Sequence, residues 1–401
     1  MSTSSSTGDT AHPGAADPSG DAHGYAPLGG RLFTPWFIFL LAVLAIACVV
    51  LVQRFVFGLG ASTNLSDGYP WGIWIAIDLI IGTALGCGGF VMAFLTYIIN
   101  RGQYHPLVRA GLMTSLFGYS LGGLAVMFDL GRWWQGYNIM LPWLINVNSV
   151  LVETALCIFA YTMVLFVEFS PAFLERFGMK DARRRLNKLL FFFTGLGCLL
   201  PMMHQSSMGT VVVLLGYQLS PLWLSQMLTV YFLITAISMG FAVVAFESVV
   251  SSAAFHRPFE TRIMGGLAGI IGWVLALFLV VRMVDVMRLG ALKLAFESNL
   301  QAMSFWTEMG LGVAAVALLL PKQGRSNPRN IFLGATAALL NGALYRLNCY
   351  LVGFEPGGGV GWTYFPSVGE IFVTLGVFSL HIVLYLVFVR YLPVLHAVGR
   401  H

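Results

Sequence analysis

Charged side chains are scarce in this sequence. Only 10% of its 401 residues are Asp, Glu, Lys or Arg, 58% are hydrophobic, and the mean hydropathy is +0.80. A water-soluble fold of this size needs far more polar surface, so the composition excludes a soluble domain and predicts an all-α polytopic membrane protein. The formal net charge of +5 is modest and indicates a charge bias among loops, not a nucleic-acid-binding surface.

Cysteine is also scarce, and its spacing excludes several kinds of site. The five cysteines lie singly in apolar runs, and the sequence has no C-x-x-C motif. This spacing excludes a protein-bound iron–sulfur cluster and indicates no disulfide framework. A twin-arginine motif and a short cleavable segment are likewise missing before the first apolar run, which predicts a retained membrane helix.

Long apolar runs fill the chain after residue 30. Residues 1–30 are rich in Ser, Gly, Ala, Pro and Asp, a composition that predicts a disordered cytoplasmic tail. Since a membrane helix needs ~20 apolar residues, we expect residues 31–401 to form a single integral membrane domain of about ten helices. The predicted spans are 35–57, 71–99, 107–128, 143–169, 189–215, 222–249, 263–283, 300–320, 330–353 and 368–392.

Lysine and arginine are distributed unevenly between alternate loops. The loops after predicted spans two, four, six and eight carry 13 Lys and Arg residues, whereas the alternate loops carry four. The positive-inside rule therefore predicts that both termini are cytoplasmic. The opposite face is rich in Trp and Tyr, as is typical of a membrane interface, and offers an uncharged docking surface.

A weak internal repeat suggests how the helices are grouped. Spans two and three, joined by QYHPLVR, resemble spans six and seven, joined by AFHRPFETR. Glu153 of span four corresponds to Glu308 of span eight, and His204 of span five to Arg346 of span nine. We therefore expect two four-helix bundles, 71–215 and 222–353, with 35–57 and 368–392 as flanking helices.

Ionisable side chains lie inside the apolar runs of the first predicted bundle. A carboxylate at bilayer depth costs several kcal/mol, so such residues commonly line an ion or substrate path. The residues concerned are Asp78, Tyr119, Asp129, Glu153 and His204. Glu153 is expected near mid-membrane, where it could take and give a proton.

Each of these residues also has a structural interpretation. Asp78 could bond to backbone or Trp N–H groups, and Glu153 could join two helices as a neutral acid. Asp129 stands three residues before Arg132, which suits a salt bridge; the pair would be structural or would line the mouth of a cavity. His204 follows an intrahelical proline and could relay a proton or donate to a quinone carbonyl.

The second half of the chain adds Glu247, Glu308, Arg346 and His381. Together with Glu153 they could form a proton path across the membrane. The alternative is a set of buried ion pairs, such as Glu308 with Arg346, that holds the bundle together. A b-type haem would need two facing histidines at depth, and only His204 and His381 are candidates, so we expect no haem.

Several motifs resemble one family. The segments NLSDGYPWGIWIAIDLIIGTALGCGGF, YHPLVR, FDLGRWWQGYN, NVNSVLVETAL and SNPRNIF resemble the NrfD/polysulfide-reductase family of membrane subunits. They are most similar to its HybB branch, the membrane subunits of periplasm-facing [NiFe] uptake hydrogenases. The resemblance covers nearly the whole chain from residue 31 onward.

The resemblance implies a subunit of a bacterial inner-membrane oxidoreductase that carries the quinone half-reaction without haem, cluster or primary catalytic metal of its own. It implies a periplasmic ferredoxin-like [4Fe–4S] partner, serving the [NiFe] hydrogenase large and small subunits, and electron transfer to menaquinone or ubiquinone with coupled proton transfer. The positions that match the family's quinone and proton residues are Asp78, Tyr119, Asp129, Arg132, Glu153 and His204. Glu153, Asp78 and His204 are then the expected catalytic residues.

Three alternatives remain open from the sequence. The catalytic partner could be a molybdopterin reductase or a multihaem cytochrome, because this subunit does not meet the primary substrate. The chain could be a non-redox secondary transporter built on the same repeat. It could also be a structural anchor that docks a periplasmic complex without contacting quinone.

Overall fold

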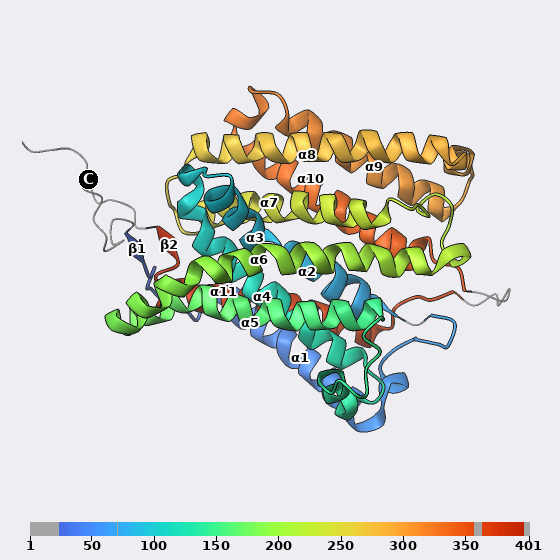
Figure 1. The fold of residues 1–401 in the computed structure, drawn as a ribbon, viewed down its shortest axis with the longest axis horizontal. Coiled ribbons are helices and arrows are strands. Elements are labelled where there is room, and N and C mark those ends of the chain that lie inside the picture. Colours follow the sequence, from blue (N-terminus) through green and yellow to red (C-terminus); the bar gives the residue numbers. More distant parts are fainter. Residues whose placement is uncertain (1–23, 70, 357–362, 397–401) are drawn as a thin grey trace, which may run out of the picture.

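The computed structural model describes residues 24–69, 71–356 and 363–396. Long helices run side by side through it (Figure 1). They are α1 (Pro35–Phe57), α4 (His105–Asp129), α5 (Val150–Arg176), α6 (Lys180–Leu214), α7 (Leu228–Ala254), α8 (Thr261–Arg288), α9 (Leu300–Leu319), α10 (Pro328–Leu347) and α11 (Val368–Tyr391). The second spanning segment consists of the π-helix η2 (Trp74–Ile81), α2 (Gly82–Leu85), α3 (Gly88–Ala93) and the π-helix η3 (Phe94–Ile98).

Short elements connect the long helices. The π-helix η9 (Asn348–Val352) continues α10. The 3-10 helices are η1 (Leu59–Ala61), η4 (Gly102–Tyr104), η5 (Trp133–Met140), η6 (Gly216–Gln218), η7 (Ala291–Phe296) and η8 (Gly324–Ser326). Two short antiparallel strands, β1 (Tyr25–Ala26) and β2 (Leu395–His396), pair near the termini.

The predicted all-α membrane fold is confirmed. Within the described residues, nine helices are long and apolar enough to cross a membrane. The remaining predicted span, 330–353, corresponds to α10 and η9, where Asn341 and Arg346 lower the hydropathy. The fourth span begins at Val150 and not at residue 143, because residues 141–149 form turns.

The helices pack as two groups with a flanking pair. The second spanning segment, α4, α5 and α6 contact one another in sequence, and α7, α8, α9 and α10 do the same. Contacts of α3 and α6 with α7 join the two groups, while α1 packs along α11, which lies against α4. Figure 1 shows α8 and α1 at opposite edges of the molecule.

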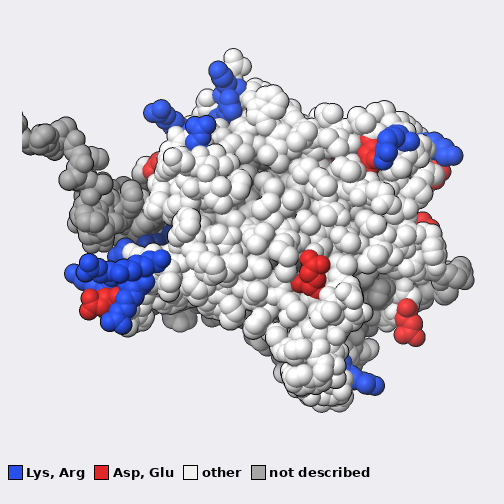
Figure 2. All heavy atoms as spheres, viewed as in Figure 1, with Lys and Arg blue, Asp and Glu red and all other residues white. Residues whose placement is uncertain are grey.

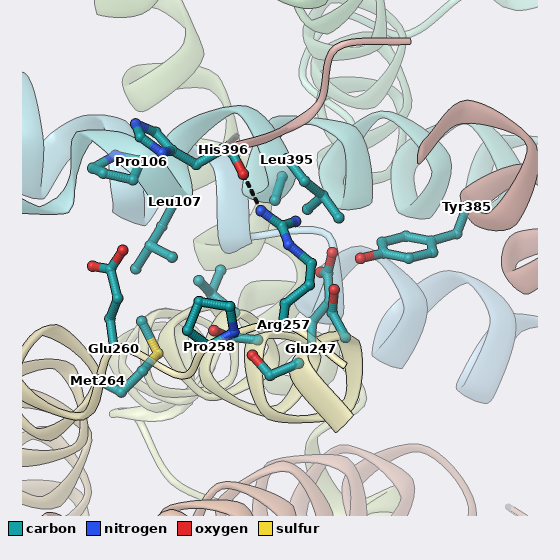
Figure 3. Close-up of a pocket in the computed structure, with 15 residues that line it drawn as sticks. Pro106, Leu107, Glu247, Arg257, Pro258, Glu260, Met264, Tyr385, Leu395 and His396 are labelled. Atoms are coloured by element: carbon teal, nitrogen blue, oxygen red, sulfur yellow. Dashed lines mark hydrogen bonds between the residues drawn. The ribbon is translucent and has the colours of Figure 1, made fainter. Parts of the chain in front are cut away.

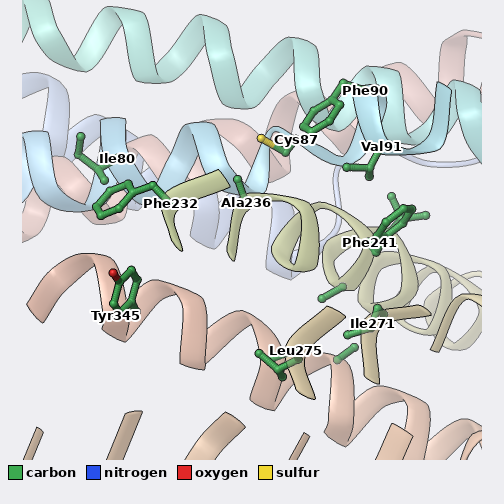
Figure 4. Close-up of a cluster of buried hydrophobic side chains, with 14 of the residues drawn as sticks. Ile80, Cys87, Phe90, Val91, Phe232, Ala236, Phe241, Ile271, Leu275 and Tyr345 are labelled. Carbon is green, nitrogen blue, oxygen red and sulfur yellow. The ribbon is translucent and has the colours of Figure 1, made fainter. Parts of the chain in front are cut away.

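Small residues allow the two groups to approach closely. Figure 4 shows Cys87 and Phe90 on the α3 side facing Ala236 and Phe241 of α7. A Cβ atom on Gly240 would lie 2.9 Å from the backbone carbonyl carbon and oxygen of Cys87, so only glycine fits there. Lipid tails are as apolar as these side chains, so close van der Waals packing holds membrane helices together.

The prediction of a disordered tail over residues 1–30 fails at the C-terminal end of that range. Tyr25 and Ala26 form β1, and the Tyr25 hydroxyl donates to the His105 backbone oxygen at 3.2 Å. The Arg109 guanidinium lies 3.9 Å from the Tyr25 ring centroid. Burial raises the pKa of Tyr25 to about 12, against the opposing effect of Arg109, so the hydroxyl stays protonated as a donor. Residues 1–23 lie outside the described part of the chain.

Charge gathers at the helix ends. Figure 2 shows an almost uncharged middle on the visible face, with a dense group of Lys and Arg where α5 meets α6. The uncharged band exposes large apolar side chains such as Phe191, Trp273 and Val280. An apolar band between charged ends is the surface expected of a protein surrounded by lipid.

Candidate functional site

Tyr119 of α4 and His204 of α6, both predicted site residues, are in direct contact. The Tyr119 hydroxyl and His204 Nε2 are 3.0 Å apart, and Gln205 Nε2 lies 3.0 Å from the same ring nitrogen. Gln205 Nε2 also reaches Thr83 Oγ1 at 3.4 Å, and Cys87 Sγ lies 3.7 Å from the Tyr119 oxygen. We call Tyr119, His204 and Gln205 the Tyr119–His204 cluster.

The packing around this cluster holds it in place but leaves two polar atoms unused. A Cβ atom on Gly86 would lie 2.8 Å from Tyr119 Cδ2, and the Tyr161 ring meets the Tyr119 ring edge-on at 4.4 Å. His204 and Gln205 are fully buried, yet His204 Nδ1 and Gln205 Oε1 have no hydrogen-bond partner among the described residues. Buried polar atoms are normally paired, so these two indicate a place for a ligand or water.

Asp78 faces α11 and not the Tyr119–His204 cluster. Its Oδ2 accepts from Thr374 Oγ1 at 3.0 Å, and its Oδ1 is buried without a partner among the described residues. The alternative of a tryptophan N–H donor to Asp78 does not hold for Trp74, which donates to the Glu370 backbone oxygen at 3.1 Å, or for Trp71, which donates to the Tyr350 backbone oxygen at 2.8 Å. Asp78 lies in the π-helix η2, a helix type found frequently at functional sites.

Asp129 and Arg132 do not form the predicted ion pair in the described structure. The chain leaves α4 in an extended conformation at Leu130, so Arg132 is exposed while Asp129 Oδ1 is buried without a partner. The buried Arg54 of α1 bonds backbone oxygens at the end of α4. Its Nε donates to the Phe128 backbone oxygen at 2.6 Å and its guanidinium also donates to the Leu130 oxygen, which neutralises the C-terminus of α4.

Glu153 does not lie at mid-membrane as predicted. Because α5 begins at Val150, Glu153 is in its first turn and its side chain is exposed. A carboxylate at a helix N-terminus is stabilised by the helix dipole. Glu153 Oε1 accepts from Ser207 Oγ at 2.8 Å, and Ser207 follows His204 by three residues on α6. Glu153 therefore lies at the exposed surface of the helix bundle and contacts α6 next to the Tyr119–His204 cluster.

Glu247 of α7 reaches a cavity of about 100 Å³ at the end of the bundle that carries β2. Thr114 Oγ1 donates to Glu247 Oε2 at 2.6 Å, and Glu247 Oε1 has no hydrogen-bond partner among the described residues. Figure 3 shows Glu247, the Tyr385 hydroxyl and Arg257 pointing into this cavity, where Arg257 donates to the His396 backbone oxygen. The cavity is mostly apolar but contains these polar groups, and it is large enough for ordered water.

The expected pairing of Glu308 with Arg346 is wrong. Glu308 Oε1 lies 3.9 Å from Arg282 Nε, and Glu308 Oε2 accepts from Trp223 Nε1 at 2.9 Å and Asn348 Nδ2 at 2.8 Å. All these groups are buried in the second group of helices. Glu308 therefore belongs to a buried ion pair with Arg282.

Arg346 and His381 lie apart from that pair. Arg346 donates to the Phe232 backbone oxygen at 2.7 Å and lies over the Phe232 ring, with its Nε unpartnered among the described residues. The His381 ring of α11 meets the Phe117 ring edge-on at 5.7 Å. Neither residue contacts the Tyr119–His204 cluster through a hydrogen bond in the described structure.

Sequence reasoning missed Glu168 of α5. This carboxyl group is buried, with 8% exposure, and lies against Gly197 of α6, where a Cβ atom would come within 2.8 Å of Glu168 Oε2. Glu168 also stands in an apolar run, which is the pattern that identified the other acids as candidates. The roles of Arg54, which bonds backbone oxygens of α4, and Arg282, which pairs with Glu308, carried no such signal, because sequence spacing does not show which distant helix supplies a cation.

Comparisons with known proteins were made for the whole chain. Residues 61–352 match the family described as "Polysulphide reductase, NrfD". The chain is 43% identical over 377 residues to the Escherichia coli protein named "Probable Ni/Fe-hydrogenase 2 b-type cytochrome subunit", covering 93% of this chain and 96% of that protein. It is 33% identical over 168 residues to the "Menaquinone reductase, integral membrane subunit" of Nitratidesulfovibrio vulgaris, covering 38% of this chain and 37% of that protein. It is 23% identical over 405 residues to a putative dimethyl sulfoxide reductase membrane subunit of Halobacterium salinarum, covering 87% of this chain and 91% of that protein.

Proposed function

Because the chain belongs to the NrfD polysulphide-reductase family, we propose that it is the quinone-reactive membrane subunit of a respiratory oxidoreductase. The relative of nearly equal length is named as a subunit of a nickel–iron hydrogenase, and another relative as a subunit of a menaquinone reductase. These names favour a hydrogen:quinone complex with [NiFe] hydrogenase and ferredoxin-like [4Fe–4S] subunits. Another relative is named as a putative dimethyl sulfoxide reductase membrane subunit, so the alternative is that this chain serves a different NrfD-type complex.

The Tyr119–His204 cluster is the observation that carries this proposal. A quinone gains two electrons and two protons on reduction to quinol, so its site needs groups that hold carbonyl oxygens and deliver protons. The 3.0 Å contact between the Tyr119 hydroxyl and His204 Nε2 would be exchanged for contacts with a quinone carbonyl oxygen. The unpartnered atoms of His204 and Gln205 support a ligand at this place.

Two polar connections could supply the protons. On the outside, Glu153 bonds Ser207, which lies one turn from His204 on α6. From the other end, the Glu247 cavity leads to Thr114, and Thr114 lies on α4 little more than one turn before Tyr119. Proton uptake through Glu247 would make turnover electrogenic. We assign Glu308 to the stability of the second group of helices because Arg282 pairs with it.

A b-type haem, which the name of the Escherichia coli relative mentions, does not fit the described histidines. His204 contacts Tyr119, whereas His381 contacts Phe117. Residues two apart on an α-helix point ~200° apart, so α4 stands between the two imidazoles. They cannot ligate one iron from opposite sides.

The orientation in the membrane follows from the charged ends. The group of Lys and Arg where α5 meets α6 lies at the end that carries β1 and β2 (Figure 2), and we assign this end and both termini to the cytoplasm. The electron-donating partner would then dock on the opposite end, in a bacterial inner membrane.

The test uses the purified complex with its native partner subunits. Glu153→Gln should abolish quinone reduction and leave reduction of an artificial dye by the partner unchanged, because only the quinone step needs this proton. Glu297→Gln, another exposed acid, is the matched control and should leave both rates unchanged. Persistent quinone turnover in Glu153→Gln would remove Glu153 from the mechanism, and purification without any iron–sulfur protein would favour the transporter alternative.

A further inference from the structure

Two adjoining cavities lie where η3, α4, α5 and α6 meet, at the end of the bundle that carries β1. Their volumes are about 660 and 800 Å³, and they share six lining residues, among them Glu168 and Asn187. The Tyr119–His204 cluster and Asp78 line neither cavity. These cavities therefore form a feature separate from the proposed quinone site.

The smaller cavity is lined by two arginines and two glutamates, Arg109, Arg183, Glu168 and Glu175, and a basic segment adjoins it. Arg109 NH1 lies 3.0 Å from Glu175 Oε2, and an Arg183 guanidinium nitrogen lies 4.0 Å from the same oxygen. The adjoining segment, residues 175–188, contains six Lys and Arg against two acids, and Figure 2 shows a dense basic group where α5 meets α6. The surroundings of this cavity therefore carry an excess of positive charge.

The larger cavity is apolar and opens toward the lipid-facing surface. Its rim includes Phe191, Phe192 and Leu199, whose side chains are 91%, 64% and 53% exposed. Gly195 of α6 also lines it, and a Cβ atom there would meet no other atom within 4 Å. The absence of a side chain at Gly195 leaves this slot open.

We propose that the two cavities together bind one anionic glycerophospholipid, with its phosphate beside Arg109, Arg183 and the adjoining basic segment, and an acyl chain in the apolar cavity. Basic pockets between membrane helices at the cytoplasmic surface bind anionic headgroups. A guanidinium has five N–H donors, so Arg109 can bind a phosphate while it keeps Glu175 and the Pro393 backbone oxygen. A quinone head is uncharged and would gain little from these arginines, which favours the phospholipid.

The experiment measures lipid retention by the full-length chain. The protein is reconstituted in phosphatidylcholine nanodiscs that contain some phosphatidylglycerol and is then released into mild detergent. Native mass spectrometry measures how many molecules of each lipid stay bound to it. Wild type should retain one phosphatidylglycerol in preference to phosphatidylcholine. Gly195→Leu, which fills the slot, and Arg183→Gln, which removes a cation without changing the core, should each reduce retention about tenfold or more.

Matched controls separate this site from general effects. Gly310→Leu places the same side chain at an exposed position of α9, where an added Cβ also meets no atom within 4 Å. This variant should retain lipid as wild type does. Arg184→Gln makes the same charge change at an exposed neighbour of Arg183 and should have little effect. Equal retention in all variants, or equal retention of phosphatidylcholine, would overturn the proposal. Labelling of Phe191 or Phe192 by a photoreactive quinone, lost in Gly195→Leu, would also overturn it and would assign the slot to quinone.

Discussion

Replacement of Glu308 by Gln should strongly destabilise the fold. Glu308 is 0% exposed and Arg282 is 1% exposed, so their charges compensate each other away from water. Besides the 3.9 Å contact with Glu308, Arg282 donates to the Leu222 backbone oxygen at 2.7 Å. A glutamine keeps the shape of Glu308, and its oxygen can still accept from Trp223 and Asn348, while its amide nitrogen replaces the oxygen that faces Arg282.

The magnitude follows from the cost of a buried charge without a partner. Removal of one member of a buried ion pair typically costs about 3–5 kcal/mol, whereas replacement of both members by apolar residues is often neutral. Glu308→Gln should therefore lower the free energy of unfolding by about 3–5 kcal/mol. The double variant Glu308→Gln/Arg282→Met, compared with Glu308→Gln and Arg282→Met alone, should recover part of this loss, which gives a coupling energy of about 2 kcal/mol or more.

The assay is reversible unfolding of the purified chain by sodium dodecyl sulfate in mixed micelles, followed by tryptophan fluorescence. Glu297→Gln, at an exposed acid, is the control and should change the free energy of unfolding by less than about 0.5 kcal/mol. The reasoning is refuted if Glu308→Gln costs less than about 1 kcal/mol, or if the single effects simply add in the double variant.

Two further predictions concern packing and proton supply. Gly209→Ala should destabilise the contact of α6 with α7, because its Cβ would lie 2.5 Å from the Leu228 backbone oxygen; the same unfolding titration should show no loss for Gly310→Ala, where no atom lies within 4 Å. Glu247→Gln should slow quinone reduction by the complex at least ~10-fold, as expected for loss of a general acid–base group, while dye reduction is unchanged; an unaltered quinone rate would show that protons take another route.

The membrane fold was predictable because it depends on local composition. Each span needs only a long apolar run, and the predicted and observed spans agree closely for α1, α9 and α11. Tyr119 and His204 were both expected in the candidate site, since ionisable groups in apolar helices commonly line a substrate path, and the structure adds their direct contact. The depth of Glu153 was misjudged because turns at residues 141–149 delay the start of α5.

The partners of buried charges could not be predicted in the same way. Spacing suggested Arg132 for Asp129, but an extended residue after α4 turns Arg132 outward, and Arg54 of α1 bonds backbone oxygens at the end of α4. The pairing of Glu308 depends on how α8 packs against α9, a tertiary contact that periodicity does not specify. Sequence patterns thus located the ionisable residues, and packing decided what each one contacts.

The central claim, that the Tyr119–His204 cluster contacts quinone, is tested most directly by the dissociation constant of a quinone-analogue inhibitor for the purified complex. Tyr119→Phe and His204→Gln should each weaken binding by about tenfold or more through loss of a hydrogen bond to the carbonyl oxygen, while Tyr217→Phe, at an exposed tyrosine, should not. An unchanged dissociation constant in both cluster variants, with quinone turnover intact, would contradict the account.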